Sequence, residues 1–203
     1  MIKFKTNLNV FILFLTIVLI FCSCSSTEKK INLKKVDGSP AYENSSLSIK
    51  EITHNEENFT FSFNVNNYEL GIQTVNEFDY NLANSAKGQH IHFIVNNGPY
   101  SAHYNEKFET ETFDDNNIIL AFLSRSHHES VKNPNAYILT QIGEDSNISL
   151  ENEFLFYSRP KGTYKGADTE KLLLDFYLVN TDLSAFGNKV RITITQNQQA
   201  NKF

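Results

Sequence analysis

Histidine side chains gather in one short part of this 203-residue chain, and imidazole is a common ligand of zinc, copper and nickel in proteins. Five of the six histidines lie between residues 88 and 129, namely His90, His92, His103, His127 and His128. The first two stand two residues apart and alternate with Ile91 and Phe93, which is the pattern of a β-strand with one apolar face. His90 and His92 are therefore predicted to project from the same polar face of that strand.

A turn signal between His92 and His103 decides whether a third histidine joins this face. Residues 96–99, Asn-Asn-Gly-Pro, predict a hairpin. A two-residue turn on residues 96 and 97, or a four-residue loop, would put His103 on the face of His90 and His92, whereas a three-residue loop would put it on the other face. Because residues 100, 102 and 104 are expected to share a face with the apolar residues 91, 93 and 95, we favour the first two registers.

Two interpretations of His90, His92 and His103 stay open. One is a site for a divalent metal ion such as copper or zinc, since facing Cβ atoms about 5 Å apart would let two imidazoles share an ion. The other is that the three side chains form the polar face of a half-exposed strand, as in any antiparallel sheet with one solvated side.

The polar loop at residues 124–135 is a second candidate site, because it is long for a connection between strands. It carries Arg125, His128 and Glu129, which could bind a ligand. His128 and Glu129 could also act as an acid–base pair, so enzyme activity stays open, although the common enzyme signatures are absent. The zinc-protease helix motif is rejected, because Lys132 stands where its second histidine is needed.

A basic loop at residues 158–166 stands out in an otherwise acidic chain. It carries Arg159, Lys161 and Tyr164. Its cations and backbone N–H groups could hold a carboxylate or a phosphate. The alternative is that they pair with the many acidic side chains of the surface.

The elements that position these residues are predicted to be strands. From residue 47 onward no stretch shows sustained helical periodicity, and short alternating or apolar runs are separated by turn residues. Residues 118–123 and 172–179 are continuous apolar runs, which predict central strands covered on both faces. The other predicted strands are residues 47–53, 59–65, 91–95, 137–142, 154–157 and an amphipathic closing strand at 190–195. The fold class is predicted to be all-β, with a single antiparallel Ig-like β-sandwich over residues 46–203.

The N-terminal residues predict a lipoprotein signal peptide over residues 1–23. Lys3 and Lys5 precede an apolar run at residues 10–21, which is too short to span a bilayer comfortably and ends just before Cys24. This resembles the bacterial lipoprotein signal, in which cleavage before the cysteine leaves it acylated; an ordinary secretory signal is the alternative. Residues 24–45 are predicted to be the lipid anchor and a flexible linker. Ser25 favours the outer membrane, with the domain facing the periplasm or the cell surface.

Charge and cysteine content exclude several classes of function. Removal of the signal peptide leaves 16 basic and 23 acidic residues, and a net charge of −7 argues against nucleic acid as a partner. Both cysteines, Cys22 and Cys24, lie in the signal region. A disulfide, a zinc finger and thiol catalysis are therefore excluded in the folded part.

Three segments together resemble an uncharacterised family of bacterial secreted proteins and lipoproteins, some of which are labelled phosphopeptide-binding proteins. The segments lie at residues 88–100, 122–134 and 157–178. The family's motifs map onto this chain as His-x-His at His90 and His92, His-Glu-Ser at 128–130, and Arg-Pro-Lys-Gly at 159–162. The residue before His-Glu-Ser is usually aromatic in that family but is His127 here, which favours His128 as the functional histidine.

These observations favour a membrane-anchored, extracytoplasmic binding module for an anionic ligand, peptide or glycan. Its candidate ligand-binding residues are Arg125, His128, Glu129, Arg159, Lys161 and Tyr164. One alternative is a copper- or zinc-binding module that uses His90, His92 and His103, or His128. Another is a structural envelope lipoprotein without a small ligand. The expected partner in every case is the lipid membrane, through acylated Cys24.

Overall fold

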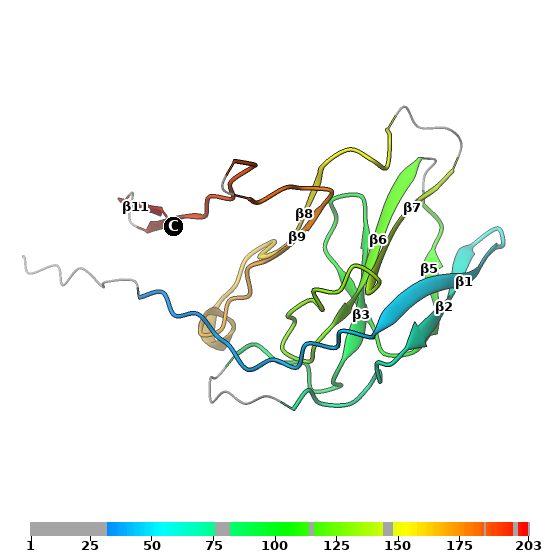
Figure 1. The fold of residues 1–203 in the computed structure, drawn as a ribbon, viewed down its shortest axis with the longest axis horizontal. Coiled ribbons are helices and arrows are strands. Elements are labelled where there is room, and N and C mark those ends of the chain that lie inside the picture. Colours follow the sequence, from blue (N-terminus) through cyan, green and yellow to red (C-terminus); the bar gives the residue numbers. More distant parts are fainter. Residues whose placement is uncertain are drawn as a thin grey trace, which may run out of the picture. The chain divides into compact units, whose positions relative to one another are not determined.

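The computed structural model describes residues 32–75, 82–113, 116–143, 148–184, 186–196 and 199–202. The predicted signal peptide and Cys24 lie outside the described residues. Within them the chain is all-β, as predicted, and its one helical element is the short 3-10 turn η1 (Gly166–Thr169) (Figure 1). No helix in the described ranges has the length and apolarity needed to cross a membrane.

The first sheet is formed by β1 (Ser46–His54), β2 (Asn58–Asn66) and β5 (Lys107–Glu111), which run antiparallel in the order β1-β2-β5. The alternation that predicted β2 is confirmed, because Phe61 and Phe63 are buried on one face of the strand. Their rings lie parallel with centroids 6.2 Å apart, and both pack on Phe108 of β5. This aromatic face forms one half of the main core.

The second sheet is central and contains β4 (Ser101–His103), β3 (His90–Val95), β6 (Asn117–Ser124) and β7 (Tyr137–Ile142), in the order β4-β3-β6-β7. Every residue of β6 is buried, which confirms that the apolar run at 118–123 is covered on both faces. One face packs on the first sheet, with Ile91 and Phe93 beside Phe61 and Phe63.

The opposite face of the central sheet is covered by the antiparallel pair β8 (Phe154–Arg159) and β9 (Asp175–Val179). Ile94, Leu120 and Phe122 pack there against Phe156 and Val179. In Figure 1 the β1–β2 pair and the β8–β9 pair flank β3 and β6. The first two sheets thus pack as a β-sandwich, and β8–β9 add a layer on the outer face; the Ig-like part of the expectation stays a prediction.

Two strand predictions near the C-terminus are wrong in extent. The run at 172–179 is not a central strand, because β9 begins only at Asp175 and pairs only with β8, while Leu172 and Leu174 are 53% and 44% exposed. The closing strand begins at Thr193, as β10 (Thr193–Gln196), and pairs with β11 (Gln199–Lys202) instead of the sandwich. An apolar run indicates extended chain, but it does not show which sheet supplies the pairing partner.

The packed domain begins before the predicted boundary at residue 46. Asn133 donates its side-chain N–H groups to the carbonyls of Glu43 and Ser45, both at 2.7 Å, and Arg125 donates to the carbonyl of Pro40 at 3.0 Å. Because the Asn133 and Arg125 side chains are buried, these carbonyls satisfy groups that would otherwise lack partners. The polar composition of this segment does not reveal that role.

Candidate metal centre and adjoining pocket

The β3–β4 hairpin has the register that the sequence analysis disfavoured. Ile91 pairs with His103, and Phe93 pairs with Ser101, so that residues 96–98 form a three-residue loop. Asn96 adopts a left-handed φ of 54°, and the Gly98 N–H donates to the Val95 carbonyl at 3.0 Å. His103 therefore lies on the face of Ile91 and Phe93, and its predicted grouping with His90 and His92 is wrong.

The physical reason lies in two tyrosines that were expected on the apolar face. Tyr100 instead stacks on His92, with ring centroids 3.9 Å apart and planes 9° apart, and Tyr104 lies 5.2 Å from His90. A tyrosine ring covers an imidazole while its hydroxyl keeps a polar contact, so these residues suit the histidine face. On the other face, His103 stacks on Phe108.

The side chains of His90 and His92 are completely buried, so the alternative of a half-exposed polar strand face is also wrong. They point to the side of the central sheet that β8 and β9 cover. Across the ladder, His92 faces Phe122 of β6, whose ring lies 4.9 Å away. Two adjacent imidazoles in such a position need a physical reason, because buried polar groups destabilise a fold unless they are satisfied.

His128 joins these two residues from the loop that follows β6. The loop is tied down by an N–H of His128 that donates to the Arg125 carbonyl and an N–H of Arg125 that donates to the Glu129 carbonyl, both at 2.9 Å. His128 itself has a left-handed φ of 69°, a conformation that L-residues adopt at a cost of about 1–2 kcal/mol. The resulting turn brings its ring to 5.1 Å from that of His90 and 5.6 Å from that of His92.

Each of the three histidines offers one nitrogen atom, and these atoms all lie within 4.8 Å of one another. His90 Nδ1 lies 2.8 Å from the Gly88 carbonyl, so this nitrogen carries the proton and leaves the Nε2 lone pair free. His92 Nδ1 lies 3.4 Å from Asp175 Oδ2, and its Nε2 lies 3.4 Å from His128 Nδ1. The hydrogen bond to Gly88 thus assigns the lone pair to His90 Nε2, which has no hydrogen-bond partner among the described residues. The Asp175 carboxylate beside His92 Nδ1 favours a proton on that nitrogen, which leaves the lone pair on His92 Nε2.

The outer contacts of the cluster match those of metal-binding histidines. Such residues almost always donate their second N–H to a carboxylate or to a backbone carbonyl, which fixes the tautomer and the orientation of the ring. Asp175 and the Gly88 carbonyl fill these roles here. Position 88 accepts only glycine, because a Cβ atom there (φ +89°) would lie 2.3 Å from the Ile72 carbonyl oxygen. This close packing fixes the position of the Gly88 carbonyl.

Burial keeps the three imidazoles in the form that binds metal. Desolvation, with the nearby His92, lowers the pKa of His90 to about 3 and that of His128 to about 4. Burial also lowers the pKa of His92, against the opposing effect of Asp175. At pH 7 all three rings are therefore neutral, and a neutral imidazole offers the lone pair that a metal requires.

Asp175 adds a buried negative charge beside these neutral rings. Burial would raise the pKa of this carboxyl, but hydrogen bonds from His92 and Ser158 outweigh that effect and lower it. The Ser158 hydroxyl donates to Asp175 Oδ2 at 2.6 Å. A carboxylate at the edge of three neutral imidazoles favours a cation among them.

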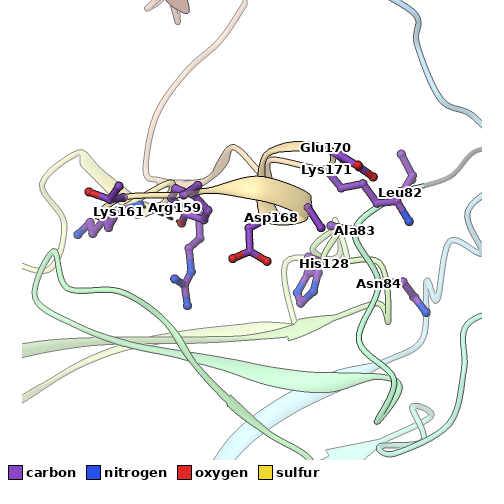
Figure 2. Close-up of a pocket in the computed structure, with 12 residues that line it drawn as sticks. Leu82, Ala83, Asn84, His128, Arg159, Lys161, Asp168, Glu170 and Lys171 are labelled. Carbon is purple, nitrogen blue, oxygen red and sulfur yellow. Dashed lines mark hydrogen bonds between the residues drawn. The ribbon is translucent and has the colours of Figure 1, made fainter.

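A pocket of about 770 Å³ adjoins the cluster, and His128 belongs to both. Figure 2 shows the side chains of Arg159, Asp168 and His128 pointing toward the central sheet. Of the six predicted ligand-binding residues, four line this pocket: His128, Arg159, Lys161 and Tyr164.

The structure does not bring Arg125 and Glu129 to the pocket. Arg125 is 3% exposed, and its guanidinium donates to the carbonyls of Pro40 and Ser130, so it holds the loop together. Glu129 Oε2 lies 3.1 Å from His127 Nε2 and also accepts from the Ser39 hydroxyl. Glu129 is engaged with His127 instead of facing the cluster with His128, which does not support the acid–base pair.

Two residues of the site were missed by the sequence analysis. Asp175 is the one charged residue in the apolar run at 172–179, and a lone carboxylate in such a run is a signal that could have found it. Tyr100 was assigned to the core. Its hydroxyl lies 3.3 Å from His128 Nδ1.

The chain matches no protein-family model, no curated protein and no solved structure. The resemblance of its three segments to a family of secreted proteins and lipoproteins therefore stays a prediction.

Proposed function

We propose that this protein binds a divalent metal ion, zinc or copper, through His90 Nε2, His92 Nε2 and His128 Nδ1. The observation that carries the proposal is the convergence of three imidazole nitrogens within 4.8 Å in a buried site. Imidazole suits both ions, and three histidines form one of the known ligand sets of zinc. The second contacts of His90 and His92 support the same conclusion.

Three protein ligands would leave one coordination position open. Structural zinc sites usually have four protein ligands, whereas sites that act on or hold another molecule keep a position for it. Among the described residues the cluster contains three such ligands, with the Tyr100 hydroxyl close by. The site is therefore of the kind that presents its metal to a further ligand.

We further propose that the domain is displayed from a bacterial membrane, most simply the outer membrane, through acylated Cys24. The support is the apolar run that ends just before this cysteine and the polar stretch that follows it. A metal-binding domain outside the cytoplasm, tethered in this way, would bind metal at the membrane surface.

The test is the metal content of the full chain, solubilised in detergent and purified without a polyhistidine tag. After treatment with a chelator, the protein is loaded with zinc or copper, freed of excess ion, and analysed by elemental mass spectrometry. We expect one tightly held ion per chain in the parent and in His103→Ala, whose histidine lies on the other sheet face. We expect His128→Gly to lose it. Equal metal content in the parent and His128→Gly contradicts the proposal, and no retained ion in the parent would favour a structural role.

A further inference from the structure

The pocket beside the metal centre is lined by one more cationic than anionic side chain. Its charged lining residues are Arg159, Lys161 and Lys171 against Asp168 and Glu170, in a chain whose net charge is −5. Within the described part of the chain, Arg159 and Lys161 form no ion pair with a carboxylate. Lys161 instead donates to the Asn97 carbonyl.

Arg159 is connected to the histidine cluster through one aromatic side chain. Its guanidinium carbon lies 4.9 Å from the centre of the Tyr100 ring, and that ring stacks on His92, which belongs to the cluster. The Tyr100 hydroxyl in turn lies 3.3 Å from His128 Nδ1. The Tyr100 side chain therefore contacts both the Arg159 guanidinium and two histidines of the cluster.

The size of the pocket argues for an organic molecule instead of a bare ion. Pockets that hold small molecules usually measure about 300–1,000 Å³, and this one measures about 770 Å³. Besides the charged residues, it is lined by Leu82, Ala83, Ala167 and Tyr164, which offer apolar contact. A guanidinium matches the planar or tetrahedral oxygens of carboxylate and phosphate groups.

We propose that this pocket holds a small organic anion whose carboxylate or phosphate group occupies the open position of the metal and is held by Arg159 and Lys161. The inference rests on the proposed metal site, because His128 is the one residue shared by both. Metal and anion would then bind together, each raising the affinity of the other by the same factor. The domain would be a receptor for the anion that works only when loaded with metal.

The test uses the full chain loaded with cobalt(II), whose visible absorption reports changes in the ligands of the ion. Acetate and inorganic phosphate are titrated separately, as probes for the two kinds of oxyanion group. We expect a saturable spectral change with at least one of them. A response to acetate alone identifies a carboxylate ligand, and a response to phosphate alone identifies a phosphate ligand.

Three variants locate the anion. Arg159→Gln and Lys161→Gln should each raise the anion concentration needed for half of the spectral change about tenfold or more, the factor that corresponds to one lost charge-assisted hydrogen bond. The cobalt content should stay at one ion per chain in both variants. Lys50→Gln, which removes an exposed lysine on β1, should respond like the parent. Cobalt that binds without any response to either anion overturns this inference and leaves the metal site intact, as does an equal response in all variants. Failure to bind cobalt at all overturns the metal site itself.

Discussion

Replacing His128 separates the two roles that the structure gives this residue, since it supplies a nitrogen to the cluster and occupies a left-handed backbone position with a φ of 69°. His128→Gly and His128→Ala both remove the nitrogen. Only the alanine variant keeps a Cβ atom in the left-handed region. We therefore expect the two variants to bind metal equally poorly but to differ in stability.

The size of that difference follows from two opposing effects. The left-handed conformation costs an L-residue about 1–2 kcal/mol, which glycine avoids. Glycine loses about 0.4–1 kcal/mol through the greater freedom of its unfolded chain. The metal-free His128→Gly protein should then be more stable than His128→Ala by about 0.5–1 kcal/mol, or roughly 1–4 °C in Tm for a domain of this size.

The metal effect is larger and appears in the parent alone. An ion at about a hundred times its Kd adds about 2.7 kcal/mol to the free energy of unfolding, or roughly 5–11 °C in Tm. Thermal unfolding followed by circular dichroism at pH 7, with and without zinc, measures both effects. Zinc that raises the Tm of His128→Gly as much as that of the parent would refute the role of His128 as a ligand. Equal stability of the two metal-free variants would refute the backbone argument.

Three further predictions concern other parts of the structure, and a fourth concerns the lipid anchor expected from the sequence. Asp175→Asn should lower zinc affinity about 10–100-fold in calorimetric titration, because the carboxylate orients His92; unchanged affinity would show that the contact has no such role. In the metal-free protein, burial lowers the pKa of His103 to about 4 from about 6.5 in the unfolded chain. Between about pH 6.5 and 4 the unfolded chain therefore binds a proton at His103 that the folded chain does not bind, so the free energy of unfolding should fall as the pH drops through this range. Urea unfolding at a series of pH values should show a smaller fall in His103→Gln. Arg125→Ala should destabilise the domain by about 2–4 kcal/mol in urea unfolding, because it leaves buried carbonyls unpaired, whereas an unchanged midpoint would place this side chain outside the packed structure. Cys24→Ser should abolish lipid labelling and release the protein from membranes, and a variant that stays labelled would contradict the proposed anchor.

Much of the fold was predictable from the sequence because, in a strand with one covered face, every second side chain is buried. The alternation of phenylalanines in β2 and the unbroken apolar run of β6 each indicated the correct strand and the correct number of covered faces. The extent of β9 was not predictable, because Leu172 and Leu174 are as apolar as the residues that pair. The local sequence shows how apolar a strand is, but the sheet that the strand joins depends on strands far away in the sequence.

The candidate site was predictable only in part. His90 and His92 were correctly placed on one face of one strand, because their spacing of two residues requires it. The predicted identity of the third histidine depended on the length of the loop in the β3–β4 hairpin. A change of one residue in that length moves His103 from one face of the sheet to the other. The sequence analysis therefore grouped His103 with His90 and His92. In the structure His128 completes the cluster, and a left-handed turn brings it there from the loop after β6.

The most direct test of the metal site is anomalous diffraction from crystals of the zinc-loaded protein, with data collected on both sides of the zinc absorption edge. We expect one anomalous peak that lies about 2.0–2.1 Å from His90 Nε2, His92 Nε2 and His128 Nδ1, the usual distance between zinc and imidazole nitrogen. A zinc peak elsewhere on the chain, with no peak among these three rings, would contradict it.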